Sequence, residues 1–389
     1  MKAVPAADRV PGPPRLLFVS TVYPTPWEPH KGPANRSTVE SLRAIGCDVR
    51  VVAPVPWTRR RGTATAVSPV ESYPTYWYPP GMFRSHYHTA MSWSIRGALA
   101  RVSASFRPDA VLGVWADPDG TVAIEHAHAL GVPGGVVAIG SDLMLLPADP
   151  KRRRVLGQTL QRADHVFAVG TVLQQKAIEL GADPARVTNF LCGVDLNRFT
   201  PGDRHQARAR LGLPANGEIL LWIGSMVPVK ATERLLHAAA RMTREFPDLT
   251  IALIGDGPRR TALEQEIAAT PALAGRVRFA GAVDHEALPD WYRAANLFVL
   301  PSRSEGVPNV LLEAMTCGLP FVASDVGSIA GLLPYGPSAV VPEGDIAALT
   351  DAIATVLRAG PSAVAPRPYD RLDGARHLLE HLGLAAGAA

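Results

Sequence analysis

The strongest constraint on the fold is a series of nine short apolar runs separated by polar or helical segments. Four of them lie in the first half of the chain: RLLFVS (15–20), DVRVVAP (48–54), DAVLGVW (109–115) and HVFAVG (165–170). Five follow residue 210: EILLWIG (218–224), LTIALIG (249–255), RVRFAG (276–281), NLFVLPS (296–302) and PFVASD (320–325). Runs of this length are typical of buried strands, and segments such as 231–246 have apolar residues at helical spacing. Strand–helix alternation predicts α/β parallel sheets with helices on both faces.

The chain has 389 residues, which is too long for one ordinary core. The strand series breaks at 196–218, a polar segment with proline and glycine. We therefore predict two Rossmann-like domains, residues 1–198 and 199–365, and a terminal helix in 366–389 that packs back on the first domain. Ligands of open parallel sheets bind beyond the carboxyl ends of the strands. Two such domains would form a cleft between two rows of loops.

Composition favours a soluble, cytoplasmic protein. Hydrophobic residues make up 47% of the chain and charged residues 19%, as in globular proteins. The three cysteines contain no C-x-x-C motif, which argues against a disulfide framework or a zinc knuckle and fits a reducing compartment. The apolar run near the N-terminus is too short for a signal peptide, and no run reaches the roughly 18 residues of a spanning helix.

The stretch PSRSEGVPNVLLEAMTCGLP (301–320) places Glu305 and Glu313 eight positions apart around a proline. It follows a predicted strand, and the pattern predicts a helix from about Pro308 to Cys317 that Gly318 ends. The first amides of such a helix, from Asn309 onward, suit a phosphate. A carboxylate at position 313 can accept hydrogen bonds from both hydroxyls of a ribose. The alternative is that both glutamates are solvated helix residues.

The segment EGVPNVLLEAMTCGLPFVASDVGSIAGLL closely resembles the E-x7-E region of family-4 glycosyltransferases, which are retaining enzymes of the two-domain GT-B fold. The resemblance extends to LLWIGSMVPVKATERLLHAA, LIGDGP, VRFAGAVDHEALPDWYRAANLFVLPS and VTNFLCGVDLNRFTP, and covers most of residues 160–345. The N-terminal part is more loosely similar. The chain looks most like bacterial enzymes that build cell-surface polysaccharides.

The resemblance implies a nucleoside-diphosphate sugar as donor and a glycan or lipid-linked acceptor. Lys230 and Glu305 would be catalytic, with Lys230 on the diphosphate and Glu305 on the sugar hydroxyls. Glu313 would hold the ribose. The remaining donor contacts implied by the family are Gly32, Gly224, Ser225, Val307, Pro308 and Asn309. No metal and no cofactor are expected, and no nucleophile is named for the retaining reaction.

Three positions depart from the family pattern. Ser225 follows Gly224 where an arginine is common, so half of the usual cationic pair is missing, and Arg303 or Arg259 could replace it. Ile139 precedes GSD where many members have histidine, and Pro33 follows Gly32 where a second glycine is frequent. The departures at Ser225 and Ile139 keep a second class open, a catalytically silent nucleotide-sugar-binding scaffold. A sugar-nucleotide epimerase or a phosphorylase of the same architecture also remains, although neither signature is evident.

Other polar groups have two interpretations each. Asp117 and Asp119 follow a predicted strand and Asp142 lies in GSDL, so all three are candidate acceptor contacts, but a helix cap explains Asp119 equally well. The histidine pairs at 86/88 and 126/128 are more typical of packing than of metal binding. In GDGP (255–258) the third glycine of a dinucleotide motif is replaced by Arg260.

Basic runs at 59–61 and 151–154 flank the aromatic segment 73–88. They predict either a face that contacts anionic lipid at the inner side of the membrane or a pair of solvated loops. No nucleic-acid-binding module accompanies them.

Overall fold

The computed structural model describes residues 12–29, 31–59, 70–360 and 369–384, which form two α/β units. Unit 1 contains the described residues up to Cys192 and the segment from Arg371, and unit 2 contains Gly193–Asp370. The predicted boundary after residue 198 therefore falls six residues later than the observed one (198 − 192). All nine predicted strands are present, and the two main sheets are parallel throughout, which confirms the predicted fold class.

The sheet of unit 1 has seven strands in the order β4-β2-β1-β6-β7-β8-β9. Their bounds are β1 Arg15–Val19, β2 Asp48–Val52, β4 Glu71–Ser72, β6 Ala110–Val114, β7 Gly134–Ala138, β8 His165–Val169 and β9 Val187–Phe190. A separate parallel pair consists of β3 Val55–Pro56 and β5 Thr75–Tyr76. The strand order reverses next to β1, and this places the loops after β1 and β6 side by side at the carboxyl edge.

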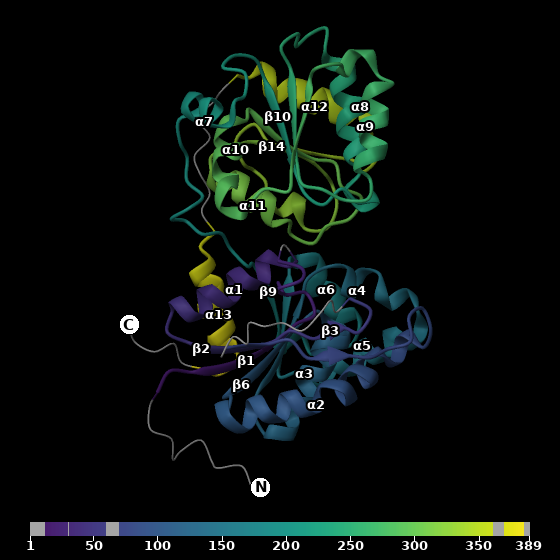
Figure 1. The fold of residues 1–389 in the computed structure, drawn as a ribbon, viewed down its shortest axis with the longest axis vertical. Coiled ribbons are helices and arrows are strands. Elements are labelled where there is room, and N and C mark those ends of the chain that lie inside the picture. Colours follow the sequence, from purple (N-terminus) through teal and green to yellow (C-terminus); the bar gives the residue numbers. More distant parts are fainter. Residues whose placement is uncertain (1–11, 30, 60–69, 361–368, 385–389) are drawn as a thin grey trace. The chain divides into compact units, whose positions relative to one another are not determined.

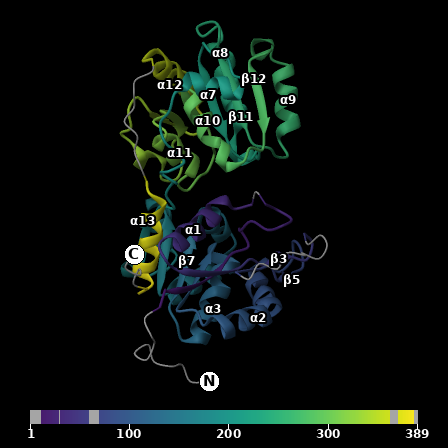
Figure 2. The same ribbon diagram turned by 60° about the vertical axis from the view of Figure 1, so that its left-hand side comes forward.

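Helices cover both faces of this sheet (Figures 1 and 2). They are α1 Pro33–Ala44, α2 Tyr87–Phe106, α3 Thr121–Leu130, α4 Ser141–Met144, α5 Pro150–Arg162, α6 Thr171–Glu179 and α13 Arg371–His381. Four short helical turns accompany them: η2 Arg84–His86, η3 Ala116–Gly120, η4 Leu146–Ala148 and η5 Pro184–Arg186. Apolar residues of α2 and α3, among them Ile95 and Val122, pack on Leu17 and Val19 of β1 and form one core layer.

Helix α13 lies beside α1 on the opposite face, although some 330 residues separate them in the chain (Figure 1, yellow and purple). Leu378 and Leu379 are fully buried there. Three histidines meet at the same contact: the ring centroids of His165 and His381 are 4.6 Å apart, and those of His377 and His381 are 4.1 Å apart. Nε2 of His165 and Nε2 of His377 lie 3.0 and 3.1 Å from Oγ1 of Thr188.

The sheet of unit 2 has six strands in the order β12-β11-β10-β13-β14-β15. The bounds are β10 Ile219–Ile223, β11 Thr250–Ile254, β12 Val277–Gly281, β13 Leu297–Leu300, β14 Phe321–Ser324 and β15 Ala339–Val341. Strands β10 and β13 are neighbours, with Leu220 paired to Leu297, so the order reverses between them. Ligand loops in open parallel sheets gather at such a reversal.

The helices of unit 2 are α7 Arg204–Leu211, α8 Thr232–Met242, α9 Arg260–Ala268, α10 Leu288–Ala294, α11 Asn309–Thr316 and α12 Ile346–Arg358. The turns are η6 Pro228–Lys230, η7 Pro271–Leu273, η8 His285–Ala287 and η9 Ile329–Leu332. Apolar residues of α8, α9 and α12 pack on alternate residues of the strands, including Trp222 and Val299. Tyr292 of α10 contacts Phe298 on the other face, at 5.9 Å between ring centroids.

Six of the described strands were not anticipated from the sequence: the two-residue strands β3, β4 and β5, and the longer strands β7, β9 and β15. The run GGVVA of β7 begins with two glycines because helix α3 and strands β6 and β8 pack too closely for side chains. A Cβ on Gly134 would lie 2.8 Å from Ile124 Cδ1, and one on Gly135 would lie 2.9 Å from Leu112 Cδ1. Glycine lowers the intrinsic strand preference of such a run, so its packing role is not visible in the pattern.

Candidate functional site

Lys230 and Glu305 form an ion pair at the carboxyl edge of the unit 2 sheet. Lys230 ends the turn η6 after β10, and Glu305 lies in the loop after β13, so the neighbouring strands bring the two loops together. Nζ of Lys230 donates to both carboxylate oxygens, at 2.7 Å to Oε1 and 3.0 Å to Oε2. The Lys230 side chain is 24% exposed and the Glu305 side chain 9%. The pair is therefore partly desolvated but accessible from one side.

Arg303 holds the turn that carries Lys230. Its amide donates to the carbonyl of Val229 (2.8 Å) and its Nε to the carbonyl of Pro228 (3.2 Å). Its Nη2 lies 3.1 Å from Oε1 of Glu233. The guanidinium thus positions the turn and neutralises an acid of α8. Arg303 was one of two candidates to replace the arginine that is common in the family. Its guanidinium is already bonded to Pro228 and Glu233.

The loop of Glu305 is fixed from behind by the loop after β14. The amide of Ser328 donates to the carbonyl of Gly306 at 3.1 Å. Gly327 has φ +60°, and a Cβ there would lie 2.2 Å from the carbonyl oxygen of Glu305. Only glycine combines this backbone conformation with so close an approach. Gly327 consequently sets the position of Glu305 without contacting its side chain.

The loop after β11 supports Gly224 and Ser225. The amide of Met226 donates to Asp256 (2.9 Å), and the amide of Arg259 donates to Met226 (3.0 Å). Gly224 is half-buried and Ser225 is exposed, so both backbones border the accessible side of the loop. Nε of Arg259 is buried and has no hydrogen-bond partner among the described residues. This nitrogen is shielded from solvent, so a ligand could reach the partly exposed Arg259 only through the outer nitrogens of its guanidinium.

Helix α11 begins as predicted near the proline, with Pro308 at the N-cap and Asn309 as the first helical residue. It ends at Thr316, and Gly318 follows with φ 76°. Val307 and Pro308 are buried, whereas Asn309 is partly exposed. In the described part of the chain no side chain caps this N-terminus. Its leading amides therefore keep the favourable potential for an anion.

Glu313 lies on α11 with only 8% of its side chain exposed, and both of its oxygens accept a hydrogen bond. The hydroxyl of Tyr292 donates to Oε2 at 2.6 Å, and Nε2 of His285 lies 2.8 Å from Oε1. Burial, followed by the charge of Glu313, raises the pKa of Tyr292 well above its ordinary value, so the phenol stays protonated and donates. Each carboxylate oxygen retains a second lone pair for a ligand hydroxyl.

His285 and Tyr292 were missed by the sequence analysis. The side chain of His285 is 37% exposed, and its ring lies against that of Phe199 in a tilted arrangement, with 5.1 Å between ring centroids. A signal was available, because HEALPDWY follows the strand β12 and polar residues after a parallel strand are candidate ligand contacts.

In unit 1, Gly32 is the N-cap of α1 with φ 57° and ψ 50°. A Cβ at this position would lie 2.2 Å from the carbonyl oxygen of Val22. The left-handed backbone and the contact with Val22 therefore require glycine here whether or not a ligand approaches. The donor contact of Gly32 stays a prediction, and Pro33 is compatible with this geometry because it occupies the first helical position.

Asp117, Asp119 and Asp142 are all fully buried at the carboxyl edge of the unit 1 sheet. Asp142 accepts from the amides of Ala116 (3.0 Å), Ile139 (3.2 Å) and Gly140 (2.8 Å), which ties the loops after β6 and β7 together. Ile139 makes this contact through its backbone amide. The contact to Asp142 therefore does not depend on whether the side chain at position 139 is isoleucine or the histidine found in many family members. Burial raises the pKa of Asp142, and the backbone donors oppose this shift.

Asp119 accepts from the amide and the hydroxyl of Thr21, both at 2.8 Å. Burial raises its pKa to about 8, against the lowering effect of these two donors. The alternative that Asp119 caps the following helix is wrong, because the N-cap of α3 is Gly120 and it has no side-chain cap. Asp119 instead fixes the loop after β1 to the loop after β6.

Asp117 belongs to a buried polar cluster with His88 and Arg152. Its Oδ1 accepts from Thr121 Oγ1 at 3.1 Å and lies 3.2 Å from Nδ1 of His88. Its Oδ2 lies 3.9 Å from Arg152 Nη2, too far for a good hydrogen bond. Among the described residues, this oxygen, His88 Nδ1 and Arg152 Nε have no well-formed hydrogen bond. Contact between the three aspartates and an acceptor stays a prediction. Of the three, Asp117 has the carboxylate oxygen without a well-formed hydrogen bond.

The histidine pairs make separate protein contacts. His126 lies 2.8 Å from the Ser103 hydroxyl and His128 lies 3.3 Å from Arg162, while His86 contacts Ser85 and His88 contacts Asp117. No cluster of three or more His, Cys, Asp or Glu residues suited to a metal ion occurs in the part of the chain that the structure describes.

Two all-parallel α/β units, each with its polar side chains at the carboxyl edge of the sheet, define the class of two-domain Rossmann-like proteins. Residues 217–359 match the family model described as "Glycosyl transferases group 1", and residues 32–193 match the "Glycosyl transferase 4-like domain". The chain belongs to the family-4 glycosyltransferases and has the GT-B fold. The family assignment made from the motifs is confirmed.

Among curated proteins, the chain is 36% identical over 289 residues to D-inositol 3-phosphate glycosyltransferase 2 of Catenulispora acidiphila. That match covers 69% of this chain and 64% of the relative, so the chain spans less than two thirds of that protein. It is 26% identical to the putative teichuronic acid biosynthesis glycosyltransferase TuaC of Bacillus subtilis, over 87% of this chain and 88% of TuaC.

Solved structures share the fold at low identity. HepE of Anabaena, in complex with UDP, has a TM-score of 0.74 and 19% identity, and the match covers 95% of this chain and 99% of HepE. Sucrose-phosphate synthase of Thermosynechococcus elongatus also has a TM-score of 0.74, with 23% identity and coverage of 96% of this chain and 95% of the synthase.

Proposed function

We propose that this protein is a retaining glycosyltransferase that moves a sugar from a nucleoside-diphosphate sugar to a glycan or lipid-linked acceptor. We place the reaction in cell-surface polysaccharide biosynthesis, on the cytoplasmic side of the membrane. The single observation that carries the proposal is the Lys230–Glu305 ion pair at the strand reversal of unit 2, followed at once by the uncapped helix α11.

The ion pair suits a diphosphate leaving group. An ammonium fixed in a partly desolvated site stabilises the negative charge that develops on the departing phosphate, and it needs no reorganisation to do so. Glu305 holds Lys230 in place before the donor binds. When phosphate oxygens take over part of the Lys230 contact, a Glu305 oxygen becomes available to a sugar hydroxyl. Catalysis would then involve no protein nucleophile, with the leaving phosphate assisting deprotonation of the acceptor.

Glu313 is built to receive a ribose. Tyr292 and His285 fix the orientation of its carboxylate, and the free lone pairs point away from these donors. A carboxylate locked by two neighbours loses little further rotational entropy when a ligand binds, which strengthens the contact. Val307, Pro308 and Asn309 would frame the phosphate and sugar at the start of α11.

Arg259 is our candidate for the second cation that Ser225 does not supply. Its side chain is partly exposed, and its amide donates to the carbonyl of Met226, the residue after Ser225. Two fixed cations and a helix N-terminus can neutralise a diphosphate, so we propose a reaction independent of metal ions and cofactors. Rates equal with and without a chelator would agree with this, and a chelator-sensitive rate restored by a divalent cation would contradict it.

Relatives support the substrate class. The HepE structures contain UDP, with glucose or as UDP-glucose, which favours a nucleotide sugar as donor here. TuaC is described as a teichuronic acid biosynthesis enzyme, which favours a surface-polymer role. The relatives that act on D-inositol 3-phosphate indicate that the acceptor differs widely within the family.

The test is transfer from a panel of labelled nucleotide sugars to a membrane extract. Wild-type protein should release nucleoside diphosphate and label the extract, and the product should keep the anomeric configuration of the donor by NMR. Glu313→Gln and Lys230→Ala should each lower transfer about a hundredfold or more. Glu245→Gln is the matched control, since Glu245 is ion-paired to Arg358 outside the site.

The assay also separates the rival functions. A silent scaffold would bind the donor in calorimetry without turnover on any acceptor. An epimerase would convert the donor with no acceptor present. Unchanged transfer in Glu313→Gln and Lys230→Ala would contradict the site assignment even if the protein proved to be a transferase.

A further inference from the structure

Five large apolar side chains in one stretch of unit 1 are exposed to an unusual degree. The exposed fractions are Trp57 47%, Trp77 57%, Met82 59%, Phe83 66% and Trp93 69%. Single exposed apolar residues are normal on protein surfaces, but three indoles and a phenyl ring from 37 neighbouring positions (57 to 93) are not. Their exposure indicates a surface that meets something other than water.

The parallel pair β3 and β5 places two of these indoles together. Val55 pairs with Thr75 and Pro56 with Tyr76, so the next position in register sets Trp57 beside Trp77. The amide of Trp57 donates to the carbonyl of Tyr76 at 3.0 Å. Residues opposite each other in parallel strands share a face. Tyr76 is buried, so the residue after it faces outward.

Hydrogen bonds join this pair to α2 and to the loop before it. The amide of Trp77 donates to Oγ of Ser94, which follows Trp93 in α2, at 3.2 Å. Tyr87 Oη donates to Pro79 and accepts from Gly81, both at 3.1 Å, which holds the loop carrying Met82 and Phe83. The segments that carry the five side chains are therefore joined to one another, and we name these five residues the aromatic face.

The segment that carries most of the aromatic face is basic. Residues 72–108 contain four arginines and no Asp or Glu. Arg84 and Arg96 are exposed, and the Arg96 guanidinium lies 5.5 Å from the ring of Trp93. The basic run 151–154 follows at the start of α5. Arginines next to exposed indoles are typical of surfaces that lie at the headgroup level of a bilayer.

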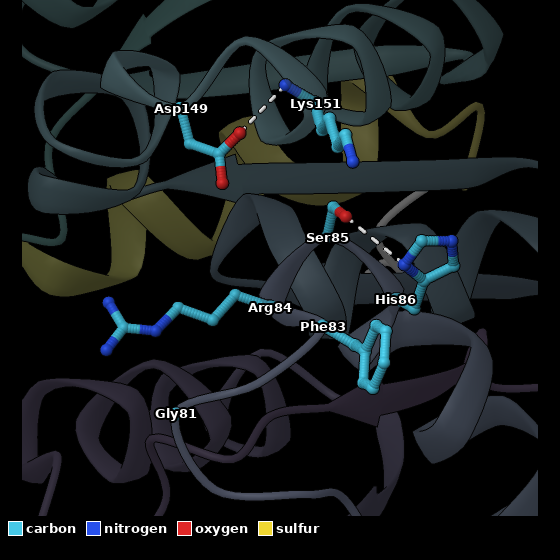
Figure 3. A pocket seen from close by; sticks show the side chains of 7 residues that line it. All are labelled: Gly81, Phe83, Arg84, Ser85, His86, Asp149 and Lys151. Carbon is cyan, nitrogen blue, oxygen red and sulfur yellow. Dashed lines mark hydrogen bonds between the residues drawn. The ribbon is translucent and has the colours of Figure 1, made fainter.

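A hollow of about 290 Å³ adjoins Phe83 on this face (Figure 3). Its lining comes from η2 and the start of α5 and includes Arg84, His86 and Lys151. The one acid in the lining, Asp149, accepts a hydrogen bond from the Lys151 amide and caps α5. The volume and the basic lining suit one phosphate-bearing headgroup.

We propose that the aromatic face binds the surface of an anionic phospholipid bilayer, with Trp57, Trp77, Met82, Phe83 and Trp93 entering the headgroup–acyl boundary. Arg84 and Arg96 contact lipid phosphates, and the hollow beside Phe83 receives a headgroup. Two observations favour a bilayer over a protein partner. The aromatic side chains project separately from a strand pair, a loop and a helix. Among the described residues, neither Arg84 nor Arg96 forms an ion pair, and the one carboxylate beside Arg84, that of Asp149, is engaged in capping α5, which differs from the mixed charges of a protein rim. Of the helices that the structure describes, none is long and apolar enough to cross a membrane.

The test is co-sedimentation with vesicles of phosphatidylcholine alone and of phosphatidylcholine mixed with phosphatidylglycerol. Wild-type protein should bind the mixed vesicles more tightly, and high salt should weaken this binding. Arg84→Gln combined with Arg96→Gln should weaken it about thirtyfold, since each basic residue near an anionic surface contributes a factor of about five. Arg241→Gln with Arg244→Gln removes two exposed charges from unit 2 and serves as the matched control.

A second variant separates the apolar contribution. Phe83→Ala with Trp93→Ala should weaken binding to mixed vesicles about tenfold or more while leaving the melting temperature unchanged, because both side chains are already exposed. Wild-type protein that ignores both kinds of vesicle, or arginine variants that bind like the control, would overturn the proposal and leave a protein partner as the explanation. Binding is measured without a nucleotide sugar, so this result is independent of the transfer assay.

Discussion

The histidine contact between α13 and the unit 1 sheet makes the stability of this unit dependent on pH. Burial, together with the nearby His381 and His377, lowers the pKa of His165 to about 4 from its ordinary 6.5. Burial also lowers the pKa of His377. The folded protein therefore keeps these imidazoles neutral at pH values where an unfolded chain would protonate them.

The direction follows from proton linkage. Between pH 6.5 and 4 the unfolded chain binds a proton at position 165 that the folded chain does not, so stability falls as the pH is lowered. With pKa values of 6.5 and about 4, the loss between pH 7.5 and 5 is about 2 kcal/mol, from RT ln[(1 + 10^1.5)/(1 + 10^−1)]. The full loss approaches about 3.4 kcal/mol (2.5 × 1.36) near pH 4 and below. His377 adds to this loss in the same direction.

His165→Gln removes the titration while keeping a donor for Thr188. In thermal unfolding, the wild-type midpoint should drop by about 4–8 °C more than the variant midpoint between pH 7.5 and 5, given about 2–4 °C per kcal/mol for a unit of this size. Other groups titrate in the same range, so the comparison is between slopes and not between single midpoints. Equal pH slopes for wild type and His165→Gln would refute the reasoning.

Three further predictions concern the two carboxyl edges. His285→Ala should raise the donor KM about tenfold, because Glu313 loses a charge-assisted hydrogen bond, with Tyr292 left in place; steady-state kinetics with an unchanged KM would contradict the positioning role. Asp119→Asn should flatten the pH dependence of stability. Because the folded protein holds the Asp119 proton up to a pKa of about 8, wild-type stability falls as the pH rises from about 4 through 8. Denaturant midpoints across this range measure the effect, and a variant as pH-sensitive as wild type would count against the raised pKa. Gly327→Ala should destabilise by about 1–2 kcal/mol and lower transfer by displacing the Glu305 loop; wild-type stability and kinetics would show that the loop adapts.

Much of the fold could be predicted because a strand buried in a parallel sheet has a continuous apolar sequence. The nine apolar runs in the sequence are nine of the strands in the two parallel sheets. Strand β7 was missed because Gly134 and Gly135 serve neighbouring helices and strands, a property of packing that a single segment does not reveal. The start of α11 was predictable because a proline and a glycine bound the helix.

The candidate site was predictable only in part. The motif identified Lys230 and Glu305, and their ion pair follows from the adjacency of β10 and β13, which the order of runs in the sequence does not give. The partners of Glu313 come from the loop and helix after β12, 21 and 28 positions earlier in the chain. Asp117, Asp119 and Asp142 resembled ligand contacts because they follow strands, whereas their complete burial depends on tertiary packing.

The return of α13 to unit 1 makes unit 2 an insertion within unit 1. During synthesis, the ribosome produces every residue of unit 2 before it produces residues 371–384, so the first-made unit waits with an uncovered apolar surface beside α1 while the second-made unit can already fold. Unit 1 therefore becomes complete only after all of unit 2 has been made, and nascent chains arrested before position 371 would expose this surface to chaperones.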